Sequence, residues 1–343
     1  MDKENKEVQA KGFKMNKADP INELQSLLRE DLNSMAVIVE DMMRSSSVPR
    51  IPEISKHIFS AGGKKLRPLL CLATAKALDY RQDRHVMLAA SIEFIHTATL
   101  LHDDVVDESS TRRGNKTANI LWNNQSSILV GDFLFSKAFQ LMVSTGSINI
   151  LEVLANTSAK IAESEVLQLS QVKNIETSIN TYMKIIEGKT AALFSAASQA
   201  GAMISSENLD YIESFKTYGK AIGLSFQLID DYLDYMGSPS KMGKNIGDDF
   251  NNSKLTFPLI SALEKSNAKE KTFLKESLLK DVKKPEDLFE VIQIMQKYNT
   301  LAETKETALK WSNIANAALS KLPKNEFTRL LGLMSNAICQ RSS

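Results

Sequence analysis

Apolar residues recur at helical spacing along most of the chain. Asp19-Pro20 is a helix start signal, and a helix is predicted after it over residues 22–46. Its apolar positions are Leu24, Leu27, Leu28, Leu32, Met35, Ile38, Val39 and Met42. The same periodicity predicts helices over residues 69–77, 86–107, 127–143, 150–170, 179–202, 211–235, 257–264, 285–298 and 302–319. No segment alternates apolar and polar residues for long enough to predict a strand. We therefore expect an all-α fold.

Two of these segments, residues 69–77 and 191–202, are apolar or small on most sides, as in helices buried inside a bundle. We predict one large helical bundle over residues 19–343, with polar side chains projecting into a deep central cavity. Residues 1–18 lack the apolar pattern, and we expect them to be a disordered or loosely helical extension. Met1 and Met15 both remain possible starts of the chain.

Composition narrows the class of protein. The chain has 343 residues, of which 43% are apolar and 24% charged, enough for a large core. Its 14 glycines and 8 prolines are few for this length, which favours long helices. The net charge of +1 gives no basis for binding nucleic acid through bulk charge. Two cysteines, Cys71 and Cys339, do not suggest a disulfide framework and fit a reducing compartment.

The sequence predicts no targeting signal and no apolar run of membrane-spanning length. The first 20 residues contain Asp2, Glu4 and Glu7 and no arginine, unlike a transit peptide. We expect a cytoplasmic protein with at most peripheral membrane contact.

Two aspartate clusters of the same form carry the strongest chemical signal. Residues 103–107 read DDVVD and residues 230–234 read DDYLD, and each cluster follows an apolar run. On a helix, positions i and i+4 share a face, so the first and last aspartates of each cluster lie together and repel each other. Carboxylate pairs of this kind suit Mg²⁺, which keeps room for water and substrate phosphate. Two such walls predict a site that holds a diphosphate through several metal ions.

Basic residues accompany the acidic clusters. Residues 62–68, GGKKLRP, place Lys64, Lys65 and Arg67 where a glycine loop enters a helix, an arrangement that favours anions. Arg112 and Arg113 follow the first cluster, and arginine forks match phosphate oxygens. Further along the chain lie Gly188-Lys189-Thr190, then Lys244 and Lys254, with Asp248-Asp249 between those two lysines.

Some of these motifs allow other interpretations. Gly188-Lys189-Thr190 is not a P-loop, because Met183 stands where that motif needs a glycine, and no strand is predicted before it. Asp248-Asp249 either caps a helix or contacts a metal through water, and we place it outside the primary site. Asp132 is interpreted as structural.

Together these motifs resemble the trans-isoprenyl diphosphate synthase family, also called polyprenyl synthetases, and most of all its octaprenyl- and decaprenyl-type members. The resemblance covers about residues 20–340. It rests on GGKKLRP (62–68), EFIHTATLLHDDVVDESSTRRG (93–114), GD (131–132), GKTAALF (188–194), FQLIDDYLD (226–234) and GKNIGDDF (243–250).

The resemblance implies a fold, an assembly and roles for single residues. The family fold is a helical bundle, the isoprenoid synthase fold, and its members are usually homodimers. The metal site, with two or three Mg²⁺ ions, would consist of Asp103, Asp104, Asp107, Asp230, Asp231 and Asp234. The contacts to the allylic diphosphate would be Arg112, Lys189, Thr190, Gln227, Lys244 and Lys254, with Lys189 also catalytic. The pocket for isopentenyl diphosphate would consist of Lys64, Arg67, His96 and Arg113.

The implied reaction is a prenyl transfer. Cations stabilise the charge that grows on the departing diphosphate. The double bond of isopentenyl diphosphate attacks the remaining allylic cation head to tail, and a proton is lost. Water must be excluded because it would quench the cation. The product is an allylic diphosphate longer by one isoprene unit, so the cycle repeats.

The length of the product is expected to follow the depth of the cavity. The positions four and five before the first cluster are Thr99 and Ala98, whose small side chains leave the path open. Each further helical turn adds about 5.4 Å, on the order of one isoprene unit. The next obstruction is Ile95, Phe135, Phe139 or Met142, although the last three also suit an ordinary core. We predict a product near C40 for a quinone side chain. The alternative is a short-chain C15–C20 farnesyl or geranylgeranyl diphosphate synthase.

Two other functions fit part of the pattern. A related all-α enzyme would cyclise the same diphosphates or join them head to head, but a cyclase has no use for the intact 62–67 loop. An inactive partner subunit of a synthase would often lack one aspartate cluster, and both are complete here.

Overall fold

The computed structural model describes residues 19–45, 47–236 and 246–341. In the first half of the chain its helices are α1 (Pro20–Leu27), α2 (Arg29–Met42), α3 (Arg50–Ser60), α4 (Leu66–Ala77), α5 (Arg84–Val106), α6 (Ala118–Leu121), α7 (Asn124–Ser144) and α8 (Ile148–Gln171). In the second half they are α9 (Ile179–Ile186), the π-helix η1 (Glu187–Ala191), α10 (Ala192–Met203), α11 (Leu209–Met236), α13 (Asp248–Asn251), α14 (Phe257–Lys265), α15 (Ala268–Leu279), α16 (Pro285–Lys297), α17 (Thr300–Leu319) and α18 (Glu326–Gln340).

The described residues contain two strands, β1 (Thr111–Arg112) and β2 (Asn115–Lys116), which pair antiparallel as a hairpin. Its turn residues, Arg113 and Gly114, have φ of 51° and 80°, as a tight hairpin turn of this hand requires. The all-α prediction is confirmed. The hairpin places Arg112 on β1 and the neighbouring Arg113 in the turn.

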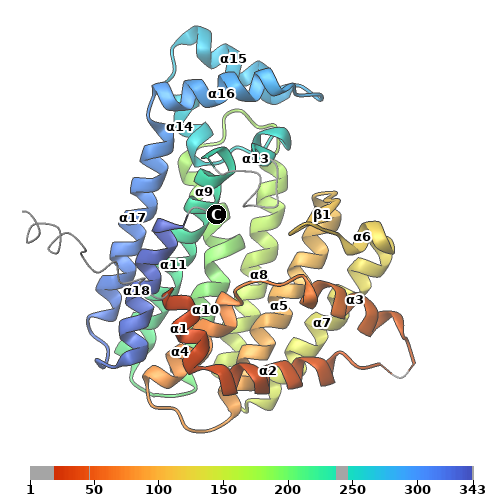
Figure 1. The fold of residues 1–343 in the computed structure, drawn as a ribbon, viewed down its shortest axis with the longest axis vertical. Coiled ribbons are helices and arrows are strands. Elements are labelled where there is room, and N and C mark those ends of the chain that lie inside the picture. Colours follow the sequence, from red (N-terminus) through yellow and green to blue (C-terminus); the bar gives the residue numbers. More distant parts are fainter. Residues whose placement is uncertain (1–18, 46, 237–245, 342–343) are drawn as a thin grey trace, which may run out of the picture.

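Two apolar clusters form the core, and α11 contributes to both. The larger cluster joins α4, α5, α7, α8 and α10 to the first half of α11 and includes Phe94, Phe194 and Phe215. The smaller cluster joins the second half of α11 to α14, α16 and α17. In Figure 1, α15 and α16 lie at one end of the molecule, beyond the bundle, and α18 runs alongside α17 toward the centre. The second aspartate cluster is in the part of α11 that packs in the smaller core.

Most predicted helices are present, and the differences have local causes. The helix predicted over residues 22–46 is interrupted at Leu28, where the backbone leaves the helical region, giving α1 and α2. Helices α3, α15 and α18 were not predicted. The start of α15 is fixed by a capping box between Asn267 and Glu270, and its apolar periodicity is weak. Nearly all of α4 is buried, as expected for a helix that is apolar on most sides.

The helix predicted over residues 179–202 is three segments, because the π-turn η1 separates α9 from α10. Gly188 lies in this turn, packed against α8. A Cβ at this position would lie 1.6 Å from the Ser164 hydroxyl oxygen, so only glycine allows the approach. Single π-turns inside α-helices are frequent at functional sites, and this one carries Lys189 and Thr190.

Helix α7 alone among the described helices has the length and hydropathy of a membrane span, with 39% of its apolar window buried. By these two criteria the prediction that no such segment exists was wrong for α7. Its buried side, with Leu134 and Met142, belongs to the larger core. Leu129 and Val143 are exposed. Length and composition do not distinguish such a core helix from a span.

Candidate active site

The structure brings the two aspartate clusters to one cavity of about 520 Å³. The first cluster is at the C-terminal end of α5, and Asp107 is the residue that ends the helix. The second cluster is on α11. Asp103 and Asp107 from one wall, and Asp230, Asp231 and Asp234 from the other, all line the cavity. The predicted pair of acidic walls is therefore present.

In the first cluster, Asp104 is held by Arg112 from the hairpin. The Asp104 side chain is 2% exposed. The Arg112 Nε donates to its Oδ1 and Oδ2 at 3.0 and 3.1 Å, and Nη2 donates to Oδ1 at 2.8 Å. Lys254 donates to Asp107 Oδ2 at 2.9 Å. The buried aspartate is thus engaged by a protein cation, and the two outer aspartates line the cavity.

The second cluster differs from the first, because Asp231 and Asp234 are both buried and both line the cavity. Asp231 is 3% exposed and accepts hydrogen bonds from the Tyr182 hydroxyl and, at 2.8 Å, from Gln227 Nε2. Burial raises the pKa of Asp231 well above its ordinary value, and these two hydrogen bonds act in the opposite direction. The side chain of Asp230 is 45% exposed and pairs with Arg341.

The charges of the first cluster fit a divalent cation. Burial, together with the carboxylates of Glu165 and Asp107 and against the opposing effect of Lys189, raises the pKa of Asp103 to about 7. The pocket therefore disfavours its own negative charge, and a hard cation would restore the ionised carboxylate. Among the described residues no three histidine, cysteine, aspartate or glutamate side chains form a complete metal site.

Lys189 reaches the cavity from the π-turn. Its Nζ donates to Glu165 Oε2 at 2.7 Å and to Gln168 Oε1 at 2.8 Å, both on α8. Burial lowers the pKa of Lys189, but Asp103 and Glu165 raise it above its ordinary value, so the amine is a cation. Thr190 donates to Gln227 Oε1 at 2.8 Å. Both side chains line the cavity as predicted.

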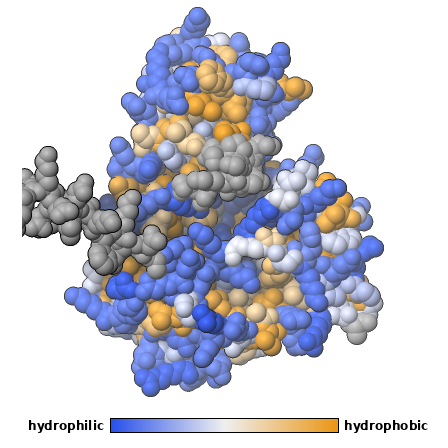
Figure 2. Space-filling view, in the orientation of Figure 1, coloured by the Kyte–Doolittle hydropathy of each residue, from blue (hydrophilic) through white to orange (hydrophobic). Residues whose placement is uncertain are grey.

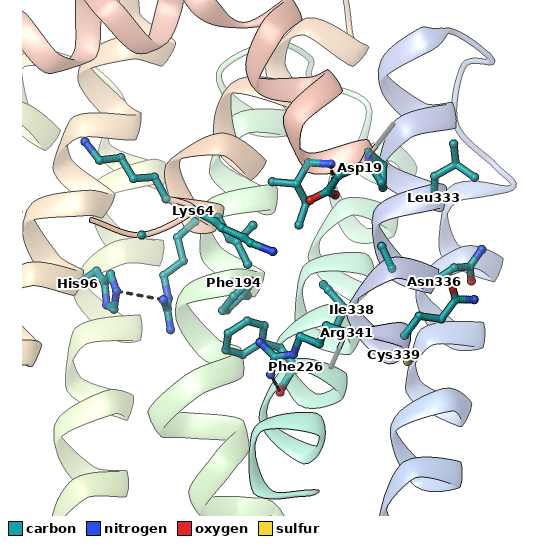
Figure 3. A pocket seen from close by; sticks show the side chains of 18 of the residues that line it. Asp19, Lys64, His96, Phe194, Phe226, Leu333, Asn336, Ile338, Cys339 and Arg341 are labelled. Atoms are coloured by element: carbon teal, nitrogen blue, oxygen red, sulfur yellow. Dashed lines mark hydrogen bonds between the residues drawn. The ribbon is translucent and has the colours of Figure 1, made fainter. Parts of the chain in front are cut away.

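A second cavity of about 1660 Å³ contains the basic groups of the 62–68 loop. Arg67 Nη1 lies 3.2 Å from His96 Nε2 (Figure 3). Burial lowers the pKa of Arg67 to about 10. Burial, helped by Arg67 and Arg113, lowers the pKa of His96 well below its ordinary value, so the imidazole is neutral. The buried Nε of Arg67 has no hydrogen-bond partner. These clustered donors fit a bound anion such as a diphosphate.

The loop that carries these groups has an unusual backbone. Gly62 and Gly63 have φ of 77° and 129°, and Lys65, which precedes α4, has φ of 45°. Arg113 donates a hydrogen bond to the Gly62 carbonyl, and its guanidinium occupies the space where a Cβ of residue 63 would lie. The glycines are therefore needed for the close approach of Arg113. Lys64 lines the same cavity.

Not every predicted residue is found at these cavities. Lys244 lies outside the described residues. Thr99 lines the smaller cavity, but Ala98, Phe139 and Met142 line neither of the two. Ala98 and Met142 are fully buried, whereas Phe139 is 37% exposed and packs edge-on against Phe135. Their role in chain length stays a prediction.

The structure adds residues that the motifs do not identify. Asp249, which we had placed outside the site, lines the smaller cavity, and its N–H donates to Asp234 Oδ2 at 3.2 Å. Arg341, just after α18, stacks on Phe226 at 4.1 Å and pairs with Asp230, as Figure 3 shows in part. Tyr182 and Glu165 are further additions. Tyr182, Glu165 and Arg341 lie outside the quoted motifs, so spacing gave no signal for them. Asp249 lies inside the 243–250 motif, but the sequence left it open between a helix cap and a metal contact through water.

Figure 2 shows a hollow near the middle of the molecular face, bordered mostly by hydrophilic residues. A helical bundle with opposed aspartates in one cavity and clustered cations in the next defines an enzyme of the isoprenoid synthase fold. Residues 48–295 match the family model described as polyprenyl synthetase. The chain belongs to the polyprenyl synthetase family and is a trans-prenyltransferase.

Relatives of known name cover nearly the whole chain. The chain is 39% identical over 322 residues to octaprenyl diphosphate synthase from Escherichia coli (strain K12), covering 93% of this chain and 98% of that protein. A decaprenyl diphosphate synthase structure from Rhodobacter capsulatus superimposes with a TM-score of 0.91 at 45% identity, covering 94% of this chain and all (100%) of that one. A polyprenyl synthase from Caulobacter crescentus, complexed with calcium and isoprenyl diphosphate, superimposes with a TM-score of 0.90 at 40% identity, with coverages of 94% and 98%.

Proposed function

We propose that this enzyme condenses isopentenyl diphosphate head to tail with an allylic diphosphate and repeats the cycle to an all-trans product near C40. The observation that carries the proposal is the pair of aspartate clusters lining one cavity, with a cluster of cations lining the adjoining one. The relatives named as octaprenyl and decaprenyl diphosphate synthases support a medium or long product over the C15–C20 alternative.

The smaller cavity binds the allylic diphosphate. Asp103, Asp107 and Asp230 are the proposed ligands of two or three Mg²⁺ ions. When bound, these ions neutralise the charge that develops on the leaving diphosphate. Lys189 and Lys254, both cations at the cavity wall, contact the same group. The calcium and isoprenyl diphosphate in the Caulobacter crescentus structure support a divalent metal at this kind of site.

The larger cavity binds isopentenyl diphosphate. Arg67 and Arg113 supply fork-shaped donors for phosphate oxygens, and neutral His96 is held by Arg67. The apolar walls beside them include Leu100 and Phe226, which line both cavities and would keep water from the reacting carbons. The proton lost in the condensation passes to the released diphosphate, so no dedicated protein base is needed.

We further propose a homodimer, based on the exposed apolar side chains of α6 and α7. Ile120, Leu129 and Val143 are 52%, 66% and 64% exposed. Figure 2 shows apolar residues gathered over α6. Exposed apolar surface of this kind marks association sites, and a second copy that covers α7 would make it an interface helix. A cytoplasmic location and a quinone side chain as the end use are parts of the same proposal.

The test is incubation of purified protein with labelled isopentenyl diphosphate and a C15 primer, with and without Mg²⁺. The proposal predicts metal-dependent incorporation of label into an apolar extract, and dephosphorylated products near C40. No incorporation would indicate an inactive subunit, and a product that stops at C15 or C20 would favour the short-chain alternative. A cyclic or head-to-head product would overturn the proposed reaction.

A further inference from the structure

We propose that Tyr182, on α9 and outside every sequence motif, is a positioning residue that holds the second aspartate cluster and the side chains beside it. The inference rests on the proposed prenyl transfer. Tyr182 is 3% exposed, and its ring packs edge-on against Phe257 with centroids 6.1 Å apart. Its hydroxyl donates to Asp231 Oδ2. The packed ring fixes the direction of the hydroxyl, so this hydrogen bond orients Asp231.

A chain of hydrogen bonds starts at Tyr182 and runs along the wall of the smaller cavity. Gln227 Nε2 donates to Asp231 Oδ1 at 2.8 Å, and Thr190 donates to Gln227 Oε1 at 2.8 Å. The Gln227 amide thus presents its NH₂ to Asp231 and its carbonyl to Thr190, so both of its polar ends are engaged. Tyr182 occupies the other carboxylate oxygen and prevents Asp231 from rotating. The orientation of Gln227 and Thr190 therefore depends on Tyr182.

The first cluster offers an internal comparison. There the buried aspartate is Asp104, 2% exposed, and Arg112 holds both of its oxygens. In the second cluster Asp231 and Asp234 are both buried, and Tyr182 with Gln227 holds both oxygens of Asp231. The middle aspartate of each cluster is thus buried and oriented by protein donors. Tyr182 has in the second cluster the role that Arg112 has in the first.

Removing the Tyr182 hydroxyl leaves one oxygen of a buried carboxylate without its donor. Loss of such an orienting partner next to a metal site lowers metal affinity or activity by about 10- to 100-fold. For Tyr182→Phe we expect kcat to fall by about that factor and the KM for the allylic diphosphate to rise. The KM for isopentenyl diphosphate should not change, because the hydrogen-bonded side chains do not line the larger cavity. These are Tyr182, Asp231, Gln227 and Thr190.

The matched control is Tyr218→Phe. Tyr218 is also fully buried, on α11, and its hydroxyl donates to the Leu331 carbonyl at 2.8 Å, away from both cavities. This variant should lose thermal stability and keep the wild-type kcat. If Tyr182→Phe has a kcat within about twofold of wild type while Tyr218→Phe behaves as expected, the positioning role is refuted.

A double-mutant cycle with Gln227→Leu distinguishes the hydrogen-bond chain from general destabilisation. If Tyr182 acts through Asp231 and Gln227, the double variant should lose about as much kcat as the worse single variant. Losses that multiply would contradict the proposal, since they would show that the two residues act independently. Wild-type protein in the same assay separates the two claims: an inactive wild type overturns the proposed function, whereas an active wild type with an unaffected Tyr182→Phe overturns only this inference.

Discussion

At the scale of single residues, the site separates aspartates that the motif treats alike. In each cluster the middle aspartate is buried and held by protein donors, and in the second cluster this aspartate, Asp231, also lines the cavity. The spacing of the motif predicts which aspartates share a helix face, and it identified both clusters. It does not predict that Arg112 or Tyr182 engages a buried carboxylate, because these donors approach from other elements.

The Arg112–Asp104 pair makes a prediction about stability. Arg112→Ala leaves the 2% exposed Asp104 carboxylate without its cation, which should lower the free energy of unfolding by about 3 kcal/mol. Arg113 is largely exposed, so Arg113→Ala should cost less than about 1 kcal/mol. Chemical denaturation of the two variants would measure the difference. If both variants lose the same free energy of unfolding, the buried Arg112–Asp104 pair stabilises the protein no more than the exposed Arg113 does.

Positions 98 and 99 make a second prediction at this scale. Thr99 lines the smaller cavity, whereas Ala98 is fully buried in the larger core. Thr99→Phe should shorten the product with little loss of stability. Ala98→Phe should also shorten it, but overpacking of the core should cost about 1–3 kcal/mol. Product chromatography and thermal melts would check both variants. An unchanged product length in both would refute the hypothesis that the growing prenyl chain passes this turn of α5.

At the scale of elements, periodicity predicted most long helices and failed where tertiary contacts decide. Segments that are apolar on most sides were correctly placed inside the bundle as α4 and α10. The π-turn η1 was not predicted, because it follows from the approach of Gly188 to α8, which no local pattern encodes. Helix α18 was missed, and with it Arg341, whose contact to Asp230 spans 111 positions.

The π-turn can be tested through Gly188. In Gly188→Ala the new Cβ would lie 1.6 Å from Ser164 Oγ and 2.7 Å from its Cβ. We expect a loss of about 1–3 kcal/mol in stability and a lower kcat, because Lys189 and Thr190 must shift. Adding Ser164→Gly removes both contacts and should restore much of the kcat. If Gly188→Ala alone has wild-type activity, the geometry of the turn is not required for function.

At the scale of the whole molecule, the fold places two acidic walls around one cavity, and their charges link stability to pH and metal. The pKa of Asp103 is raised to about 7, above its ordinary value near 3.8. A group with a raised folded-state pKa stabilises the protein fully at pH values below its ordinary pKa, and this contribution is lost as the pH rises through the folded-state value.

Metal-free protein should therefore lose thermal stability as the pH rises from about 3.8 to about 7, and Mg²⁺ with inorganic diphosphate should reverse much of this loss near pH 7. Melting curves in chelator and in Mg²⁺, at pH values between these two limits, would show the difference. Asp103→Asn is the control and should weaken the pH dependence of the metal-free protein. A metal-free melting temperature that stays constant or rises across this range would contradict the pKa assignment.

The central claim is that opposed carboxylates bind a diphosphate through divalent cations within one cavity. The most direct measurement is a crystal structure with Mn²⁺ and an unreactive allylic thiodiphosphate, with the metals located by anomalous scattering. We predict metal positions within bonding distance of Asp103 or Asp107 on one wall and of Asp230 on the other, sharing the diphosphate oxygens. Metals bound elsewhere, or a diphosphate held without metal between the two walls, would contradict the claim.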